Sequence, residues 1–254
     1  MSKNKLKKFA EIDRFEHVFQ MSVSNILAGE QFPLRGKWHT GFFGNDAPVT
    51  IELGCGRGEY TIEQARQFPE KNFIGIDIKG ARLWTGAKQA KEDGLTNVAF
   101  LRTDIQALHA FFAPDEISEL WITFPDPQMK KCRKRLTSTL FLSQYRRILV
   151  PDGIIHLKTD SGFLFAYTCE LARVNGLPVS ACTDNLYDSP LAQEPVLQIK
   201  TYYEQQWLAR GIPIKYLAFR LPVGGALIEP DIDIPYDNYR SYGRQKRSDL
   251  FATQ

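Results

Sequence analysis

The stretch ELGCGRG, residues 52–58, decides the fold of this 254-residue chain. A short apolar run at residues 49–53 leads into it, and a segment of helical composition at residues 59–67 follows it. Glycines at such a turn let the backbone approach a ligand closely, and the first N–H groups of the helix point at whatever is bound there. The stretch therefore predicts a strand, a ligand-binding turn and a helix in succession.

Alternating strand-like and helix-like segments continue through the chain. The sequence predicts strands at residues 73–76, 98–101, 119–124, 153–159 and 214–221, and helices at residues 81–92, 105–112, 139–149, 162–174 and 202–209. The sequence PDG at 151–153 predicts a turn, and residues 183–200, which hold two prolines and no clear periodicity, predict a loop insertion. Repeated β–α units imply an α/β fold with a parallel sheet whose ligands bind beyond the carboxyl ends of the strands.

An acid follows the second expected strand. Asp77 comes nineteen residues after Gly58, where a carboxylate can accept hydrogen bonds from both hydroxyls of a ribose. A dinucleotide site favours the spacing G-x-G-x-x-G, whereas the third glycine comes one residue earlier here, in G-x-G-x-G, and Glu52 would repel a pyrophosphate. A ligand with a ribose, an adenine and a cationic amino-acid tail fits better, and the pattern resembles the class I S-adenosylmethionine-dependent methyltransferases. Asp104, after the third strand, matches the position that holds the adenine edge in that family, or else caps the following helix.

The charge of the chain is unevenly distributed. Its formal net charge of +3 comes from 32 Lys and Arg against 29 Asp and Glu. Three windows without acids, residues 1–8, 130–135 and 240–247, hold thirteen of the basic residues, so a mildly acidic body carries basic patches. That pattern favours a polyanion bound at one face, although for residues 1–8 alone a solubilising tail is the favoured explanation.

A stiff acidic loop follows the strand expected at residues 119–124. The sequence FPDP at 124–127 flanks Asp126 with two prolines, which fix φ and remove backbone donors. Five basic residues in six follow at 130–135. The FPDP sequence could be a rigid turn whose aspartate only caps the backbone. The basic run directly after this acid instead favours a loop with a function.

Three further motifs narrow the resemblance to one family. FPDP followed by Lys130, PDG before a strand that ends in KTD at 158–160, and TYYE at 201–204 together resemble the bacterial tRNA (guanine-N7)-methyltransferases over about residues 45–221. The resemblance implies that S-adenosylmethionine methylates N7 of a guanine in the variable loop of tRNA. It also implies a Rossmann-like fold with a mostly parallel seven-stranded sheet, helices on both faces and an antiparallel last strand.

The resemblance assigns roles to particular residues. The cofactor-binding set is Glu52, Gly54, Gly56, Asp77, Asp104 and Asp126, with Asp126 also at the position called catalytic; the substrate-binding set is Lys130, Asp160, Thr201, Tyr202, Tyr203 and Glu204. Arg133, Lys134 and Arg135 are expected to contact tRNA phosphates. This chain has Gln128-Met129 where many members have Trp-His, which removes an aromatic pair from the loop, and Tyr202-Tyr203 where many have Lys-Phe, which removes a phosphate contact.

The expected chemistry needs no general base, because guanine N7 has a lone pair and no proton to lose. A fixed carboxylate beside the purine would be favoured as the ring becomes cationic, and Asp126 or Asp160 is expected to accept hydrogen bonds from the guanine Watson–Crick edge. Tyr202 or Tyr203 would stack on an unstacked base, or else belong to the core. The alternatives are a methyltransferase acting on another RNA, a protein or a small molecule, a non-catalytic RNA-binding module, and an NAD(P)-dependent dehydrogenase.

The remaining expectations concern organisation and location. We expect a basic extension at residues 1–45 packed on the domain, a methyltransferase domain at 46–221 and a basic tail at 222–254. The four cysteines form no CxxC pair, so we expect no metal site, and free thiols suit a cytoplasmic protein. No apolar run approaches the ~18 residues of a spanning helix, so no membrane association is expected. Monomer and homodimer both remain open.

Overall fold

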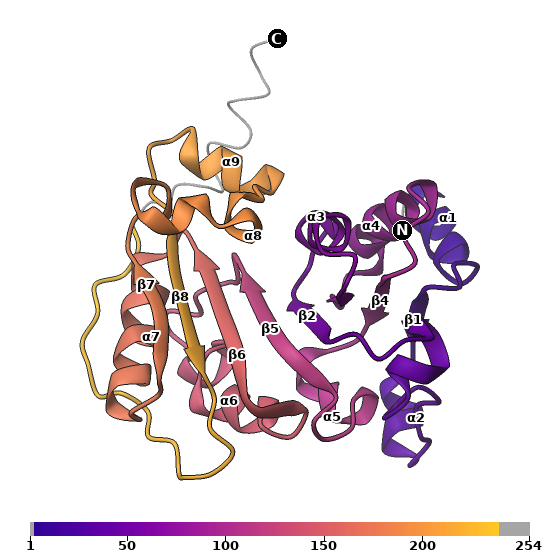
Figure 1. The fold of residues 1–254 in the computed structure, drawn as a ribbon, viewed down its shortest axis with the longest axis horizontal. Helices are drawn as coiled ribbons and strands as arrows, with labels where there is room; N and C mark the ends of the chain where they lie inside the picture. The colour runs from indigo at the N-terminus through magenta and orange to yellow at the C-terminus, as the bar shows by residue number, and fades with distance from the viewer. Residues whose placement is uncertain (1–2, 239–254) are drawn as a thin grey trace.

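The sheet at the centre of the computed structural model, which describes residues 3–238, runs β1-β4-β3-β2-β5-β6-β8-β7 (Figure 1). Strands β1 to β6 are parallel to one another, and β8 is antiparallel to both β6 and β7. The strands are β1 (Val18–Gln20), β2 (Val49–Leu53), β3 (Asn72–Ile76), β4 (Val98–Arg102), β5 (Ile117–Thr123), β6 (Leu149–Thr159), β7 (Val179–Thr183) and β8 (Lys215–Arg220). The mostly parallel sheet with an antiparallel last strand is confirmed, with one strand more than the seven expected.

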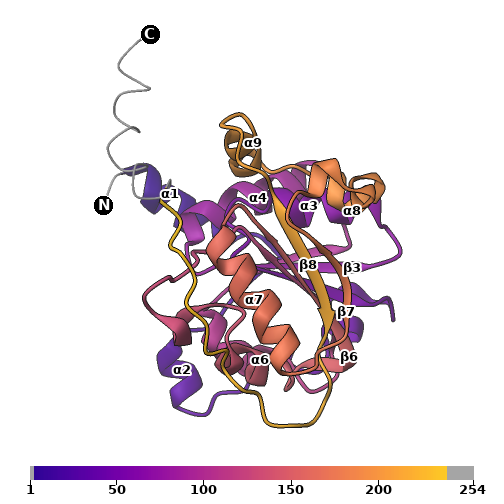
Figure 2. The same ribbon diagram turned by 90° about the vertical axis from the view of Figure 1, so that its left-hand side faces the viewer.

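Helices lie on both faces of this sheet. They are α1 (Lys3–Ile12), α2 (Val23–Leu27), α3 (Glu59–Gln67), α4 (Gly80–Glu92), α5 (Leu108–Phe111), α6 (Thr139–Tyr145), α7 (Gly162–Val174), α8 (Pro195–Gln198) and α9 (Tyr202–Leu208). Shorter turns are the π-helical η1 (Trp38–Phe43) and the 3₁₀ turns η2 (Ile105–Ala107), η3 (Cys132–Lys134), η4 (Leu186–Asp188) and η5 (Pro190–Gln193). In Figure 2, α7 lies in front of the sheet, and the yellow segment that follows β8 runs beside it.

The alternation of side chains along the central strands builds two hydrophobic layers. On β3, Ile74 and Ile76 pack in the cluster that contains residues of α5, α6 and α7, whereas Phe73 packs in the cluster formed with α3 and α4. Both β2 and β3 are buried along their whole length, as central parallel strands covered on two faces are. A third cluster joins Trp121 of β5 to residues of η4, α8 and α9.

Several elements lie where the sequence predicts them, and two strands of the sheet are not predicted from the sequence. Residues 49–53, 59–67 and 162–174 coincide with β2, α3 and α7. The sequence predicts neither β1, which has only three residues, nor β7, an edge strand whose side chains are mostly exposed. Neither strand is long or apolar enough to give a periodic signal.

The loop expected at residues 183–200 is wrong, because the segment contains η4, η5 and α8. Pro190 and Pro195 were the reason for that prediction, yet each stands at the start of a helical turn. Proline is well suited to the first position of a helix, where its missing N–H group would have no intrahelical partner. The prolines therefore begin short helices here.

The turn expected at residues 151–153 lies within β6. Asp152 has φ of +57°, and the pairing with β5 jumps from Ile117–Leu149 to Glu119–Ile154. Three extra residues on β6 are thus accommodated as an irregularity in the ladder. The local geometry is turn-like, but the strand continues through it.

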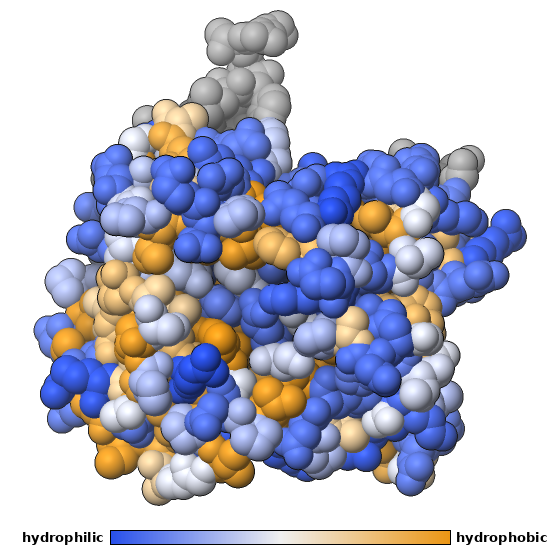
Figure 3. Space-filling model, viewed as in Figure 1, coloured by the Kyte–Doolittle hydropathy of each residue, from blue (hydrophilic) through white to orange (hydrophobic). Residues whose placement is uncertain are grey.

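The face of the sheet below α8 is only partly covered. Figure 3 shows hydrophobic side chains at the surface there, over β6 and β8. Ile154 and Ala181 are half-buried against the third cluster in this part of the sheet. Coverage by η4, α8 and α9 is concentrated toward the carboxyl end of the strands, where the expected site residues lie.

Candidate active site

The glycine loop leaves open space above its first two glycines. Gly54 and Gly56 have φ of +74° and +59°, and a Cβ atom added at Gly54 would meet no atom within 4 Å. A Cβ at Gly56 would meet only the carbonyl of Gly54, at 3.9 Å. At Gly58 the same atom would lie 2.7 Å from Phe100, so this third glycine serves the packing of the loop on β4. The first two glycines therefore face a cradle that a ligand can fill.

Asp77 fixes the shape of this loop from the end of β3. Its side chain is 8% exposed, Oδ2 accepts a hydrogen bond from the N–H of Gly56 at 2.9 Å, and Oδ1 accepts one from Lys79 N–H at 2.7 Å. A carboxylate has about four acceptor positions, so two remain for other donors. The residues present thus fit a nucleoside whose ribose hydroxyls donate to Asp77.

Glu52 braces the loop from beneath. It is 3% exposed; its Oε2 accepts hydrogen bonds from the N–H and the hydroxyl of Thr61, and its Oε1 accepts one from the Thr123 hydroxyl at 2.5 Å. Burial raises the pKa of Glu52, although these donors act in the opposite direction. The side chain ties β2 to α3 and β5, while its direct contact with a cofactor stays a prediction.

Asp104 follows β4 and is exposed at the same edge. Its Oδ1 accepts a hydrogen bond from Gln106 N–H at 2.9 Å, which caps the turn η2. The capping explanation is therefore confirmed. A cofactor contact through the remaining acceptor positions stays a prediction.

The loop after β5 holds Asp126 out toward solvent. Pro125 and Pro127 are buried on either side of it, and the non-glycine residues Phe124 and Gln128 have φ of +48° and +47°. Such backbone is costly and persists only where the surroundings impose it. Asp126 Oδ1 accepts a hydrogen bond from Gln128 N–H at 3.0 Å. The result is an exposed carboxylate on a fixed loop beyond the sheet.

Arg135 holds that loop from behind. It is 8% exposed, and its guanidinium lies 4.3 Å from the ring centroid of Tyr167 and 4.7 Å from that of Phe163. It also donates to the carbonyl of Met129 at 3.0 Å. Lys130, Arg133 and Lys134 are exposed, as a phosphate contact requires. Arg135 faces α7 and the loop, so we leave it out of the proposed phosphate contacts.

The start of α9 lies between the glycine loop and the Asp126 loop. The N–H of Tyr202 donates to Glu59 Oε2 at 2.7 Å, and Glu59 is the first residue of α3. The ring of Tyr203 packs edge-on against Phe124 with centroids 5.9 Å apart. Thr201 caps the helix by accepting from the N–H of residue 204 at 3.2 Å. Three of the predicted segments thus converge at one edge.

Two predicted substrate residues are buried in this arrangement. Glu204 has no exposed surface and forms an ion pair with Lys158 at 3.0 Å, and Lys158 also donates to the carbonyl of Ile199 at 2.7 Å. Burial raises the pKa of Glu204 and lowers the pKa of Lys158, and the opposite charge of each partner works against both shifts. Asp160 is also fully buried, and its carbonyl accepts a hydrogen bond from Lys215 at 3.3 Å. Contact of either carboxylate with a substrate stays a prediction.

Sequence reasoning missed the groups that hold the predicted residues in place. These are Glu59, Thr61, Thr123, Lys158 and Tyr187, whose hydroxyl donates to Glu204 Oε1 at 2.5 Å. Only Lys158 carried a signal, since a lysine in an otherwise apolar central strand needs a buried partner. The others are ordinary residues of helices and strands until the fold brings them together.

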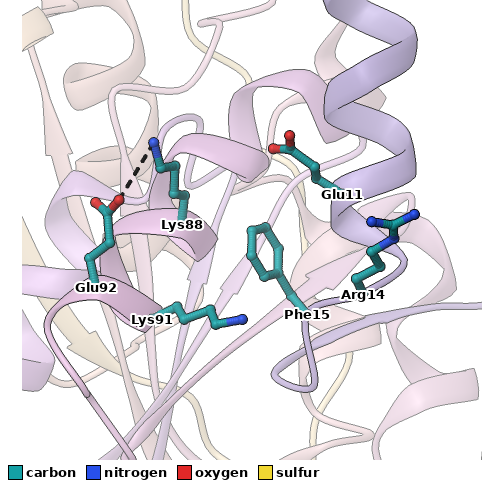
Figure 4. Close-up of a pocket in the computed structure, with 6 residues that line it drawn as sticks. All are labelled: Glu11, Arg14, Phe15, Lys88, Lys91 and Glu92. Atoms are coloured by element: carbon teal, nitrogen blue, oxygen red, sulfur yellow. Dashed lines mark ion pairs between the residues drawn. The ribbon is translucent and has the colours of Figure 1, made fainter.

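A surface pocket of about 500 Å³ lies elsewhere, between α1 and α4. Figure 4 shows its lining residues: Glu11, Arg14, Phe15, Lys88, Lys91 and Glu92. Lys88 pairs with Glu92 at 3.5 Å, and Glu11 accepts a hydrogen bond from Trp84 Nε1 at 2.7 Å. None of the sequence-predicted residues lines it, and its mixed charges do not define a site for an anion.

Within residues 3–238 no group of three His, Cys, Asp or Glu side chains is arranged to hold a metal ion. Over that same part of the chain, no helix combines the length and the apolar character needed to span a bilayer.

The fold and the cradle define the class I S-adenosylmethionine-dependent methyltransferases, and the comparisons agree. Residues 46–217 match the family described as "Putative methyltransferase". A tRNA (guanine-N(7)-)-methyltransferase of Bacteroides thetaiotaomicron is 57% identical over 250 residues, 98% of each chain, and one of Porphyromonas gingivalis is 57% identical over 93% of this chain and 98% of its own. The solved 16S rRNA methyltransferase KamB matches 74% of this chain and 92% of its own with a TM-score of 0.55 at 15% identity, a likeness of fold alone.

This chain belongs to the tRNA (guanine-N7)-methyltransferase family. It is an enzyme whose methyl donor is S-adenosylmethionine.

Proposed function

We propose that this protein methylates N7 of a guanine in the variable loop of tRNA. What carries the proposal is 57% identity, over 98% of both chains, to a relative named tRNA (guanine-N(7)-)-methyltransferase. The exposed carboxylate of Asp126 and the exposed cations Lys130, Arg133 and Lys134 that follow it in the chain support the proposal. A protein that acts on a nucleic acid contacts both a base and the phosphate backbone. S-adenosylmethionine supplies an electrophilic methyl group on a sulfonium centre.

The protein's task in this reaction is positioning and charge stabilisation. Guanine N7 attacks through a lone pair, so no residue has to remove a proton first. Holding the two reactants in line turns a bimolecular encounter into an effectively intramolecular step. Asp77 and the cradle above Gly54 and Gly56 would hold the donor, and the Asp126 loop would hold the base.

Asp126 is the group we assign to the purine. Because its loop is fixed by Pro125, Pro127 and Arg135, the carboxylate needs little reorganisation as positive charge develops on the ring. Its free acceptor positions suit the N1–H and 2-amino donors of guanine, which adenine does not present. Asp126 takes this role in preference to Asp160, which is fully buried.

Tyr202 is the aromatic group we assign to the unstacked base. Its side chain is 57% exposed, while Tyr203 is half-buried and packs on Phe124. A base drawn out of folded RNA loses its stacking neighbours, and an exposed aromatic ring can replace one of them. Tyr203 would instead support the loop that carries Asp126.

One assay tests the proposal. The protein is incubated with unmodified tRNA and S-adenosylmethionine labelled in its methyl group, and the tRNA is then digested to nucleosides. We expect the label in 7-methylguanosine. Label in another nucleoside, or transfer to protein or small molecules with none to tRNA, would overturn the proposal.

A further inference from the structure

Two cysteines face each other at one edge of the sheet, Cys169 on α7 and Cys182 on β7. Their Sγ atoms lie 3.8 Å apart. Both are free thiols; Cys169 is half-buried and Cys182 is exposed. Figure 1 shows α7 beside β7 at the left-hand edge of the sheet. Neither thiol has a part in the methyl transfer proposed above.

The alternation of side chains along β7 explains why Cys182 points toward α7. Ala181, the preceding residue, packs against the third hydrophobic cluster. Because neighbouring side chains of a strand point to opposite faces, Cys182 points to the other face, which α7 covers. Its partner in β8, Leu217, lies in the cluster that also contains residues of α7, and Cys169 packs against that same cluster. The fold therefore directs the two sulfurs toward each other.

The other two cysteines have different surroundings. Cys55 is 7% exposed in the glycine loop, and burial raises the pKa of its thiol. Cys132 donates a hydrogen bond to Glu229 Oε2 at 3.0 Å, so its sulfur contacts a carboxylate. These thiols serve as internal references for the reactivity of Cys169 and Cys182.

Closing the Cys169–Cys182 pair into a disulfide requires little movement. The sulfurs of a disulfide are about 2.05 Å apart, so these two have to approach by roughly half of their present separation. Rotation of the exposed Cys182 side chain about χ1 moves its sulfur far enough. The backbone of the helix and of the strand can stay in place.

The two thiols differ in access and in acidity. Cys182 is exposed, so a dissolved oxidant reaches it first. Burial, together with the nearby Cys182 sulfur, raises the pKa of Cys169 to about 12. Cys169 is therefore protonated at neutral pH and is a poor first nucleophile. In a second step its position compensates, because an attack on Cys182 is intramolecular.

We propose that Cys169 and Cys182 form a reversible disulfide that fastens β7 to α7 when the protein meets a small-molecule disulfide such as glutathione disulfide. The Cys182 thiolate attacks one sulfur of this oxidant, whose S–S bond breaks and releases one glutathione thiolate. The Cys169 sulfur then attacks Cys182 Sγ and displaces the second glutathione thiolate. The two protein thiols thus give two electrons to the oxidant, and their two protons go to the two glutathione thiolates released.

The bond secures an edge of the sheet. Within the described residues β7 is the outermost strand, pairs with β8 and has mostly exposed side chains. An edge strand held on one side opens more readily than a central strand. The helix to which the bond fastens β7 also carries Phe163 and Tyr167, the rings beneath Arg135. The inference does not depend on the proposed function, since it concerns the fold and two thiols outside the methyl-transfer site.

The test treats the folded, reduced, full-length protein with glutathione disulfide. The protein is then digested without reductant, and the peptides are analysed by mass spectrometry. We expect the peptides that contain Cys169 and Cys182 to be joined, and dithiothreitol to separate them. Titration of the oxidised protein with a thiol reagent after denaturation should count two free thiols in place of the four in the sequence. The oxidised protein should also melt at a higher temperature than the reduced protein.

Variants separate the two thiols. Cys169→Ser removes the thiol that resolves the intermediate, so we expect Cys182 to keep a glutathione adduct. The double variant Cys169→Ser/Cys182→Ser should melt at the same temperature with and without the oxidant. The matched control Cys132→Ser leaves the pair intact and should form the same cross-link as the wild type.

Two results would overturn the inference. One is a wild-type protein without the cross-link between Cys169 and Cys182, whether it stays reduced or carries separate glutathione adducts. The other is an oxidised wild-type protein that melts at the temperature of the reduced protein, which would show that the bond does not fasten β7.

Discussion

The Asp126 loop and the first turn of α9 meet at the same edge of the sheet, yet they present their polar residues in opposite ways. The loop exposes Asp126 and buries the arginine that supports it. The helix exposes the ring of Tyr202 and buries the carboxylate of Glu204 in an ion pair with Lys158. Each segment therefore contains an exposed residue that a substrate can reach and a buried residue that supports the local structure, and burial distinguishes the two kinds.

The largest effect should come from the buried ion pair. Glu204→Gln leaves the Lys158 ammonium buried without a counter-charge, and breaking such a pair costs about 3–5 kcal/mol of the free energy of unfolding. Chemical denaturation followed by circular dichroism measures the loss. The double variant Lys158→Met/Glu204→Leu should recover part of it. If Glu204→Gln instead unfolds like the wild type and only raises KM for tRNA, Glu204 belongs with the substrate-facing residues.

Asp126→Asn should act on the rate and leave the fold unchanged. Removing a preorganised charged group of this kind lowers kcat by about 100- to 1,000-fold, whereas exposed substitutions change the free energy of unfolding by about 0.5 kcal/mol or less. Single-turnover methylation with tRNA and S-adenosylmethionine both saturating gives the rate. Nearly full turnover in this variant would remove Asp126 from the chemistry.

A third carboxylate, Glu119, lies outside both regions; it is half-buried and is paired with Lys71 and His156. Burial alone would raise its pKa, but His156, Lys71 and Trp121 outweigh that effect and lower the pKa of Glu119 to about 2. Its stabilisation is therefore present above its ordinary pKa and is lost as the pH falls toward 2, a contribution of about 3 kcal/mol. Glu119→Gln should be less stable at neutral pH and show a flatter acid dependence of unfolding.

Tyr202 and Tyr203 are adjacent in the first turn of α9, but Tyr202 is exposed and Tyr203 is half-buried. Tyr202→Ala should weaken tRNA binding by about 1–3 kcal/mol, the range measured for a base stacked on an aromatic ring, with no change in thermal stability. Tyr203→Ala should lower the melting temperature, because its ring packs on Phe124 and Trp207. Fluorescence anisotropy with tRNA and thermal melts of both variants decide the matter. An exchange of the two outcomes would mean that the buried ring, not the exposed one, meets the RNA.

The smallest effect should come from the exposed cations of the loop. Arg133→Ser/Lys134→Ser should reduce the slope of log Kd against log salt by roughly two, with base choice unchanged. Arg135→Lys, matched in charge, should leave that slope intact and lower the rate, since lysine cannot lie flat over Tyr167 while donating to the loop. An unchanged slope in the first variant would make these two side chains a solvated surface.

The sequence was sufficient for the fold class and for the edge at which the site lies. The glycine loop, Asp77 and FPDP each follow a strand, so a parallel sheet has to bring them together. The sequence was not sufficient to predict which side chains are exposed. Glu204 and Asp126 are both acids in short motifs, and only the fold around Lys158 shows that Glu204 is the buried one. The burial of Arg135 and the helical turns that begin at Pro190 and Pro195 could not be predicted for the same reason: local residue type does not show what packs against it.

The central claim, that this site methylates guanine at N7, is tested most directly with a modified substrate. A tRNA whose variable-loop guanine is replaced by 7-deazaguanine keeps the Watson–Crick edge that Asp126 is proposed to bind but lacks the attacking nitrogen. We expect it to bind with wild-type affinity and to accept no methyl group in a single-turnover assay, while the unmodified tRNA is methylated at that guanine. Methyl transfer to the 7-deaza tRNA at the unmodified rate would contradict the account.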